Sequence, residues 1–426
     1  MTVTAAPDEG DDARGAVAAV WRIESARLIA GLTRLVRDVG TAEELAQDAL
    51  VAALEQWPRD GVPDNPGAWL MATAKRRGID LIRRREMYAR KLSEVGEDLR
   101  RRQDGGRDDF DAVDEDRIED DVLRLVFTAC HPVLATEARV ALTLRMIGGL
   151  RTDEIARAFL VAEPTVAQRI VRAKKALAAA QVPFEVPQGA ERAERLASVL
   201  EVIYLVFNEG YSATAGDDWM RPALCEDALR LARLLQGLMP DEPEVHGLAA
   251  LLEIQASRSA ARTGPDGEPV LLADQNRSRW DQVLIRRGIA ALALAGKTAQ
   301  GPAGPYVLQA AIAVCHTRAR RAEDTDWGEI AALYGQLVRV APSPVVELNR
   351  AVAVSMAQGP EAGLAIVDAI ANEPAIQGYH LLPSVRGDLL AKLGRGAAAR
   401  AEFERAATLT RNQRERELLL RRAEEA

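Results

Sequence analysis

Apolar residues recur every three or four positions through most of this sequence, and this spacing constrains the fold more than any other feature. Val166, Ile170, Ala173 and Leu177, for example, follow one another at helical intervals. Runs of alternating Val, Ile and Thr, which are typical of strands, are missing. A chain of 426 residues is long enough for roughly two to three domains. We therefore predict an all-α protein with more than one helical domain.

Charge and cysteine content exclude several classes of protein. The net charge is −8, so any surface that binds nucleic acid must be local. The three cysteines are far apart and odd in number, which argues against a disulfide framework and favours a reducing cytoplasm. The acidic first 15 residues are unlike a signal peptide, and no apolar run approaches the roughly 18 residues of a membrane span. We expect a cytoplasmic protein with no membrane partner.

Changes in composition divide the chain into five segments. Between residues 104 and 121 there are ten acidic residues and two arginines, which cannot bury enough apolar surface to order themselves. A second break, rich in proline, spans residues 182–189. The predicted segments are a disordered tail (1–15), a helical block (16–90) with one loop at 57–66, an acidic linker (91–117), a second helical block (118–182) and a helical C-terminal half (190–426).

The first block contains an amphipathic helix over residues 42–57. Thr41 is a candidate N-cap, and Glu43 and Glu44 suit the positive end of the helix. Leu45, Ala49 and Ala52 form an apolar stripe, whereas Gln47 and Asp48 lie off it. These two polar residues could equally belong to an ordinary solvated face.

After the loop and the run at residues 65–70, the helical stretch Met71–Arg85 concentrates basic residues beside a tryptophan. Eight basic and two acidic residues occur between positions 75 and 91. Helical spacing places Trp69, Arg76, Asp80 and Arg83 on one common face. It turns Ala72, Ile79 and Ile82 toward the core. Cations neutralise phosphates and an aromatic ring stacks on bases, so this face suits nucleic acid. The alternative is a buried Trp69 with solvated arginines.

The second block ends in a helix-turn-helix pattern over residues 149–177. Thr152 is a candidate cap for a helix that runs to about Phe159, and Pro164 begins the next helix. Polar and basic residues of that second helix lie opposite its apolar stripe. This division is typical of a recognition helix, in which N-terminal side chains reach bases and later cations reach phosphates. Similar patterns also occur in plain helical bundles.

Three short motifs in this order resemble regions 2 and 4 of bacterial RNA polymerase sigma factors of the extracytoplasmic-function type. Glu-Glu-Leu-Ala-Gln-Asp spans residues 43–48, and Asn-Pro-Gly-Ala-Trp-Leu at 65–70 is followed by an Ala-x5-Asp spacing at 74–80. Gly-Leu-x3-Glu-Ile-Ala spans residues 149–156. No intervening segment is long enough for a region 3. Residues 164–167 depart from the pattern, so the resemblance implies no particular base preference.

The resemblance implies a sigma factor that binds core RNA polymerase, recognises promoter DNA, opens its strands and starts transcription. It implies contacts of the first helix with the β′ clamp helices through Leu45, Gln47, Asp48 and Val51. It implies binding and opening of the −10 element by Asp64, Asn65, Trp69, Arg76, Arg77, Asp80, Arg83 and Arg84. It implies −35 recognition by Thr165, Gln168, Arg169, Arg172, Lys174 and Lys175, with the β flap as a further polymerase contact. The acidic linker would then thread toward the RNA exit path, or act only as a tether.

The C-terminal half resembles the long tetratricopeptide-like extension of one subgroup of these sigma factors. Gly359 and Gly394 lie 35 residues apart, each between two amphipathic segments, and this period is close to that of such repeats. Residues 264–305 do not fit the repeat, so an irregular helical domain is the alternative. Asn208, Glu209 and Tyr211 could line a groove for a regulatory protein or ligand, or could simply cap a turn.

Motifs that would indicate an enzyme are missing. The sequence has no Walker loop, no dinucleotide-binding glycine motif and no Gly-x-Ser-x-Gly elbow. The adjacent pairs Cys130-His131 and Cys315-His316 have a poor spacing for zinc. We expect no catalytic residue, no metal and no cofactor. The main alternative function is a stand-alone helix-turn-helix regulator with a helical sensing domain, which would not bind core polymerase.

Overall fold

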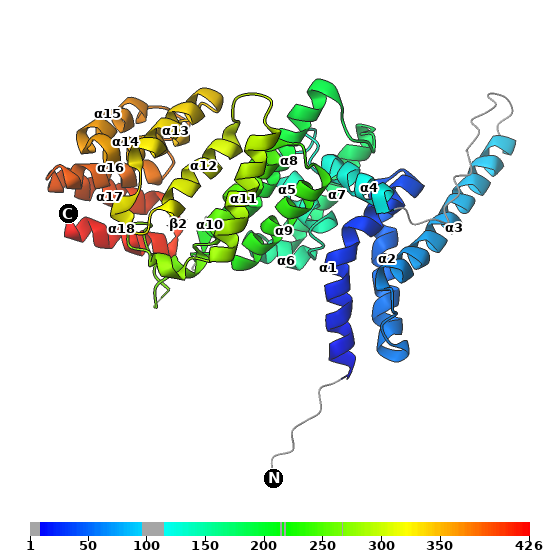
Figure 1. Cartoon of the computed structure of the whole chain (residues 1–426). Coiled ribbons are helices and arrows are strands. Elements are labelled where there is room, and N and C mark those ends of the chain that lie inside the picture. Colours follow the sequence, from blue (N-terminus) through cyan, green and yellow to red (C-terminus); the bar gives the residue numbers. More distant parts are fainter. Residues whose placement is uncertain (1–8, 96–114, 214, 217–218, 266) are drawn as a thin grey trace, which may run out of the picture. The chain divides into compact units, whose positions relative to one another are not determined.

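The computed structural model describes residues 9–95, 115–213, 215–216, 219–265 and 267–426. Within these residues the chain forms 18 α-helices (Figure 1), which confirms the predicted all-α class. The strands of the described part are two residues long each, and β1 (Ala215–Gly216) pairs in parallel with β2 (Arg411–Asn412). The chain divides into two compact units, Met1–Val202 and Ile203–Ala426, which we describe separately.

The first unit holds seven helices and most of an eighth, which continues into the second unit. In chain order they are α1 (Glu9–Val36), α2 (Val39–Asp60), α3 (Pro66–Val95), α4 (Glu115–Ala129), α5 (Thr136–Met146), α6 (Thr152–Ala158), α7 (Glu163–Ala179) and α8 (Gly189–Tyr211). Residues 1–8 and 96–114 lie outside the described part, so the predicted tail and linker are described only at their edges. There, residues 9–15, 91–95 and 115–117 are helical.

The ends of α2 differ from those expected. Asp38, not Thr41, is the N-cap, because its carboxylate accepts a hydrogen bond of 2.6 Å from the Thr41 backbone N–H. At the other end, Pro58 lies inside the helix and Gly61, with φ of 85°, follows its last residue. The loop between α2 and α3 is therefore shorter than the predicted loop at residues 57–66.

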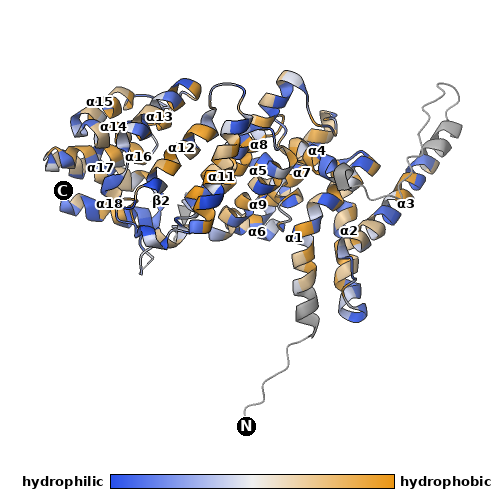
Figure 2. Cartoon of the chain, in the orientation of Figure 1, coloured by the Kyte–Doolittle hydropathy of each residue, from blue (hydrophilic) through white to orange (hydrophobic). Residues whose placement is uncertain are grey.

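Apolar faces of α1, α2, α4 and α5 build the core of the first unit. Ile29, Phe127, Leu142 and Leu144 are all fully buried. α1 is central because it packs against α2, α3 and α4. Figure 2 shows the corresponding pattern, in which apolar residues gather along one side of a helix and hydrophilic residues along the other. The predicted amphipathic spacing is thus used for packing.

The first part of α8 is fixed to α4 and to the turn that follows α4. Arg195 donates a hydrogen bond of 3.0 Å to the carbonyl oxygen of Phe127, and the Ser198 hydroxyl donates one of 2.6 Å to the carbonyl oxygen of Cys130. Both side chains are buried. Residues after the 182–189 break therefore support the second helical block, and the units divide within α8 rather than at residue 190.

The second unit is a succession of helices joined by short turns. After α8 they are α9 (Pro222–Leu238), α10 (Pro243–Ala256), α11 (Gln282–Thr298), α12 (Pro305–Arg318), α13 (Trp327–Val340), α14 (Pro344–Gln358), α15 (Pro360–Ile370), α16 (Leu381–Lys392), α17 (Gly396–Leu409) and α18 (Gln413–Glu425). Three single-turn 3₁₀ helices lie between them: η1 (Ser259–Ala261), η2 (Arg277–Arg279) and η3 (Ala322–Asp324). Gly359 and Gly394, with φ of 103° and 69°, stand at the turns between the predicted paired segments.

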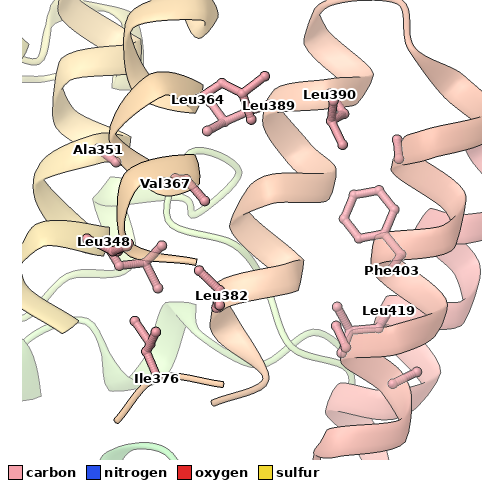
Figure 3. Close-up of a cluster of buried hydrophobic side chains, with 14 of the residues drawn as sticks. Leu348, Ala351, Leu364, Val367, Ile376, Leu382, Leu389, Leu390, Phe403 and Leu419 are labelled. Carbon is pink, nitrogen blue, oxygen red and sulfur yellow. The ribbon is translucent and has the colours of Figure 1, made fainter. Parts of the chain in front are cut away.

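A continuous apolar cluster holds the last five helices together (Figure 3). Leu348 comes from α14, Val367 from α15, Leu382 from α16, Phe403 from α17 and Leu419 from α18. Each of these side chains is at most 3% exposed. Because each helix contributes to its neighbours' burial, the segment packs as a layered helical array.

No helix in the described residues combines the length and the apolar character that crossing a membrane would require.

Candidate functional site

Helix α7 presents a polar face opposite a buried one, as predicted. Val166, Ile170, Ala173 and Leu177 are buried. Four of the predicted −35 residues are exposed, namely Thr165, Gln168, Arg172 and Lys175. The other two, Arg169 and Lys174, are half-buried. The stripe fixes the rotation of the helix, so the exposed side chains are held together on one side.

The turn that precedes α7 gives this block its helix-turn-helix geometry. α6 begins after Arg151, whose backbone N–H donates a 2.7 Å hydrogen bond to the Glu154 carboxylate, so Thr152 is not the cap that we expected. Leu160 adopts a left-handed conformation with φ of 50° and is exposed. Pro164 lies in the first turn of α7, as predicted.

Helix α3 exposes a strongly basic face. Five predicted −10 residues on it are exposed: Arg76, Arg77, Asp80, Arg83 and Arg84. Opposite them, Leu70, Ala74 and Gly78 are buried. Ala72, which we expected in the core, is exposed, and Ile79 and Ile82 are only half-buried. The basic face is nevertheless open along the helix from Arg76 to Arg84.

Two tryptophans meet at the beginning of this face. The Trp69 ring lies 5.5 Å from the Trp57 ring in an edge-to-face arrangement, and Trp57 is only 3% exposed. Trp69 itself is half-buried, so its side chain is neither enclosed in the core nor fully exposed to solvent. Just before it, the Asn65 amide oxygen accepts a 3.0 Å hydrogen bond from Ala68 N–H and caps α3, while Asp64 is exposed. The tryptophan pair fixes one edge of Trp69 and leaves the rest accessible.

Only part of the predicted polymerase-binding set on α2 lies on the surface. Asp48 and Val51 are exposed and Gln47 is half-buried, but Leu45 is 6% exposed and lies in the core beside Gly78. We therefore correct the expectation for Leu45, which positions the helix from inside. Asp48 forms an exposed ion pair of 3.5 Å with Arg77 of α3.

Glu43 links the two helical blocks, a role that the sequence did not indicate. Its side chain is 7% exposed and lies between Arg145 of α5, at 2.9 Å, and Lys174 of α7. The sequence predicts only that Glu43 suits the positive start of the helix. Lys174, predicted to contact DNA, is instead engaged by a carboxylate of the first block.

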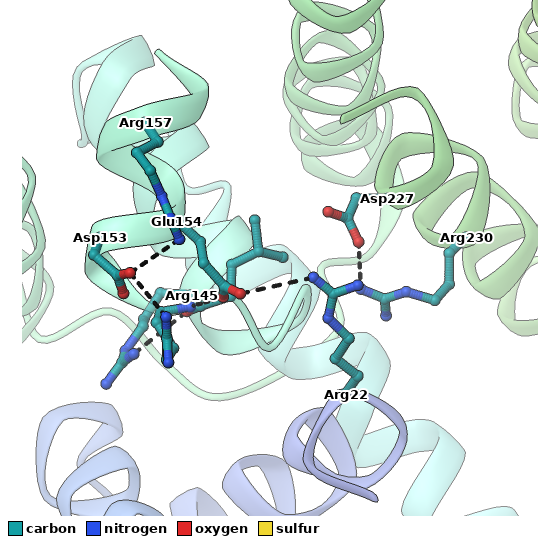
Figure 4. A network of polar contacts seen from close by, with 9 residues as sticks. Arg22, Arg145, Asp153, Glu154, Arg157, Asp227 and Arg230 are labelled. Carbon is teal, nitrogen blue, oxygen red and sulfur yellow. Dashed lines mark hydrogen bonds and ion pairs between the residues drawn. The ribbon is translucent and has the colours of Figure 1, made fainter. Parts of the chain in front are cut away.

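Other contacts between the blocks lie along α1. Arg34 pairs with Asp121 of α4 at 3.4 Å, and burial raises the pKa of Asp121 against the lowering effect of Arg34 and Arg124. At the other side, Arg22 lies 4.0 Å from Glu154 of α6, within the network of Figure 4. A side chain at Gly149, whose φ is 69°, would come within 2.8 Å of Ser25. This glycine of the predicted motif therefore permits close packing of α1.

The three candidate residues at the end of α8 differ in their surroundings. Glu209 forms an ion pair with Arg221 and so has a structural partner, whereas Asn208 is half-buried. The Tyr211 ring stacks on Phe207 at 5.4 Å, but its hydroxyl is buried without a hydrogen-bond partner among the described residues. Tyr211 alone points to a further site.

Next to Tyr211 lies a group of cations, one buried and two half-buried, that sequence reasoning missed. The arginine cluster consists of Arg258, Arg262 and Arg277, from η1 and η2 and their flanks. The guanidinium carbon of Arg262 lies 3.6 Å from the centroid of the Tyr211 ring. Burial lowers the pKa of Arg262. One sequence signal for this cluster is the Asn-Arg-Ser-Arg-Trp-Asp run at 276–281. It lies in the segment that fits no repeat.

His316 of α12 lies beside this cluster and should make folding stability depend on pH. Burial, reinforced by Arg258 and Arg277, lowers the pKa of His316 to about 4. In the unfolded chain the pKa of this histidine is near 6.5. Between about pH 6.5 and 4 the unfolded chain therefore binds a proton at His316 that the folded chain does not bind. We expect stability to fall by up to about 3 kcal/mol as pH decreases from about 6.5 to 4. Chemical denaturation across this range should show the loss, and His316→Gln should reduce its slope; an unchanged slope would contradict the assignment.

The three cysteines are buried free thiols. Burial raises the pKa of Cys130 to about 11 and that of Cys225 to about 12, so both stay protonated. In the described residues, no group of three or more His, Cys, Asp or Glu side chains is arranged to hold a metal ion.

The first unit combines a helix-turn-helix with a basic helix that has a tryptophan near its start, and both are held by buried apolar faces. These features define a DNA-binding protein. Family comparisons agree with this class. Residues 23–87 match the model for sigma-70 region 2, and residues 124–177 match that for sigma-70 region 4. Residues 195–296 match a family of unknown function, DUF6596.

A similar chain occurs in Rhizobium meliloti (strain 1021). That uncharacterized protein is 46% identical over 382 residues, which is 89% of each chain. No solved structure shows a significant match. The chain belongs to the same family as this relative, and its first half carries the two sigma-70 regions. These two regions support a role in promoter recognition together with core RNA polymerase.

Proposed function

We propose that this protein is a sigma factor of the extracytoplasmic-function type in which α2 docks on the β′ clamp helices, α3 binds the −10 element and α7 reads the −35 element. The β flap would be a further polymerase contact of region 4. The observation that carries the proposal is that both family regions expose a polar or basic helix face supported by a buried apolar stripe. Core polymerase and promoter DNA as partners imply action in the cytoplasm.

Strand opening at the −10 element requires no covalent chemistry. An unstacked base must be captured and the nearby phosphates neutralised, and extruding a base costs a few kcal/mol. The accessible part of Trp69 offers a stacking surface, and Arg76, Arg83 and Arg84 supply cations along the same helix. Because Trp57 fixes the Trp69 ring beforehand, less side-chain entropy is lost when a base stacks on it.

Upstream recognition would use the exposed residues of α7. Thr165 and Gln168, near its N-terminus, are placed as base-reading side chains, and Arg172 and Lys175 as phosphate contacts. Lys174 would join them only after it leaves Glu43.

Replacing one exposed cation of α7 should weaken DNA binding in a salt-dependent way. For Arg172→Ala we expect about tenfold weaker binding to −35 duplex DNA and a slope of log K against log salt that is smaller by about 0.9, since one phosphate contact is lost. Fluorescence anisotropy at several salt concentrations measures both quantities. Arg27→Ala, an exposed arginine of α1, is the matched control; equal effects of the two variants would contradict the assignment.

Transcription in vitro with purified core polymerase on random promoter DNA tests the proposal as a whole. We expect the full chain to bind core polymerase and to enrich a defined pair of −10 and −35 sequences. A stand-alone regulator would bind DNA without core polymerase and would start no transcription. That result would overturn the proposal.

The C-terminal unit is proposed to modulate this activity in cis as a tetratricopeptide-like helical array. Its layered helices offer a large surface for a regulatory protein or ligand. A truncation at residue 190 would remove Arg195 and Ser198, which support region 4, so a truncation after Tyr211 is the better test. Promoter-specific transcription that is unchanged by this truncation, with and without cell extract, would refute modulation.

A further inference from the structure

We propose that the arginine cluster of the second unit, Arg258, Arg262 and Arg277, is a binding site for the phosphate or carboxylate group of a small ligand. The cluster lies in the segment that matches a family of unknown function. The inference goes beyond the proposed function, because the binding can be measured without RNA polymerase or DNA.

Arg258 carries the argument. It is only 8% exposed, and among the described residues its side chain makes no ion pair and no hydrogen bond; its Nε is buried without a partner. Its guanidinium carbon lies 5.8 Å from the Tyr211 ring centroid, at the outer limit of a cation–π contact. An arginine that is buried without a counterion is costly, so buried charges are normally paired.

The neighbours of Arg258 add further positive charge and do not compensate the charge of its guanidinium. Arg262 donates a 2.9 Å hydrogen bond to the Tyr211 carbonyl oxygen, and Arg277 donates to the carbonyl oxygens of His316 and Ala319 at 2.6 and 2.7 Å. In the described part of the chain, no carboxylate is within ion-pair distance of any of the three guanidinium groups. Glu323 and Asp324 act on Arg277 only from a longer distance.

Several buried polar atoms around Arg258 also have no hydrogen-bond partner in the described residues. They are the Nε atoms of the three arginines, the Tyr211 hydroxyl and the Nδ1 of His316. Each of these atoms is a donor or can donate, and an oxyanion, which only accepts, would suit them all. Because the imidazole of His316 is kept neutral by burial beside Arg258 and Arg277, its ring can donate from Nδ1 in one tautomer.

Burial decides the size of the ligand. A guanidinium that is 8% exposed offers too little surface to a flat protein interface or to DNA, so we infer a small molecule that ends in a phosphate or carboxylate group. Guanidinium forks bind both groups in a bidentate manner.

Calorimetric titration of the full-length protein tests the site. Sodium phosphate and sodium acetate are titrated separately at constant ionic strength, with sodium chloride as the blank. We expect saturable binding of one of the two at a single site, which identifies the ligand group as phosphate or carboxylate. No saturable binding of either probe would mean that ordered water alone satisfies the cluster, and would overturn the proposal.

Variants separate this site from general surface charge. Arg258→Gln should weaken binding at least tenfold, whereas Arg279→Gln, the same change at an exposed position of the same loop, should alter it less than twofold. Equal losses in the two variants, or none in Arg258→Gln, would contradict the site. If Arg258→Gln does not fold, Arg258→Lys keeps the buried charge without the fork, and at least fivefold weaker binding is expected; unchanged binding would refute the proposal.

Discussion

Asp48→Lys should abolish promoter-specific transcription while leaving −35 duplex binding by region 4 intact. Asp48 is exposed on α2 at the face proposed to meet the β′ clamp helices. Reversing a charge at such an interface typically costs at least about 2 kcal/mol, or about 30-fold in affinity, and like charges add repulsion. We therefore expect the loss of binding to core polymerase to account for the loss of transcription. Pull-down with core polymerase, transcription in vitro and DNA anisotropy measure the three activities.

The design of this test depends on the Asp48–Arg77 pair. The substitution places a lysine ammonium next to Arg77, but the pair is exposed and exposed pairs contribute little to stability. Folding should therefore be unchanged by circular dichroism. Glu361→Lys makes the same charge change on an exposed helix position of the second unit and should leave transcription normal. If Asp48→Lys binds core polymerase as tightly as the unsubstituted protein, α2 is not the docking helix.

Glu43→Ala should destabilise the first unit by about 3–5 kcal/mol, because it leaves Arg145 and Lys174 without their shared carboxylate. The two cations are only 16% and 17% exposed, so water replaces the lost partner poorly. Faster hydrogen exchange of the α5 and α7 backbone amides would report the change within this unit alone.

Two comparisons make the Glu43 prediction specific. Glu44→Ala, the exposed neighbour, should change stability by less than about 0.5 kcal/mol. Combining Glu43→Ala with Lys174→Met should recover part of the loss, because the unpaired ammonium is then gone. Similar exchange rates for Glu43→Ala and Glu44→Ala would show that the bridge contributes nothing.

Helical periodicity was sufficient to predict most of the fold. The stripe from Val166 to Leu177 is buried as expected, because one face of a regular helix must pack. Errors arose where a local signal competed with tertiary packing. Ala72 has no strong preference for either environment, and packing around Leu70 and Ala74 left it outside. Pro58 predicts a loop, but it lies inside α2, where a proline near the end of the helix removes only one backbone hydrogen bond.

The candidate site was predictable only where its residues share one helix. The exposed faces of α3 and α7 follow from spacing within each helix. Glu43 meets Arg145 and Lys174 across separations of 102 and 131 residues, which no local pattern encodes. The arginine cluster likewise depends on how η1, η2 and α12 come together.

The bridge made by Glu43 sets a geometric condition on promoter binding. The −10 and −35 elements are centred about 25 base pairs apart, which at ~3.4 Å per base pair is on the order of 80 Å along the duplex. One carboxylate cannot remain bonded to Lys174 of α7 while α3 and α7 occupy sites that far apart. A sigma factor working as proposed must therefore break this bridge at every initiation event, and its regions 2 and 4 must lie closer together in the free protein than on the promoter.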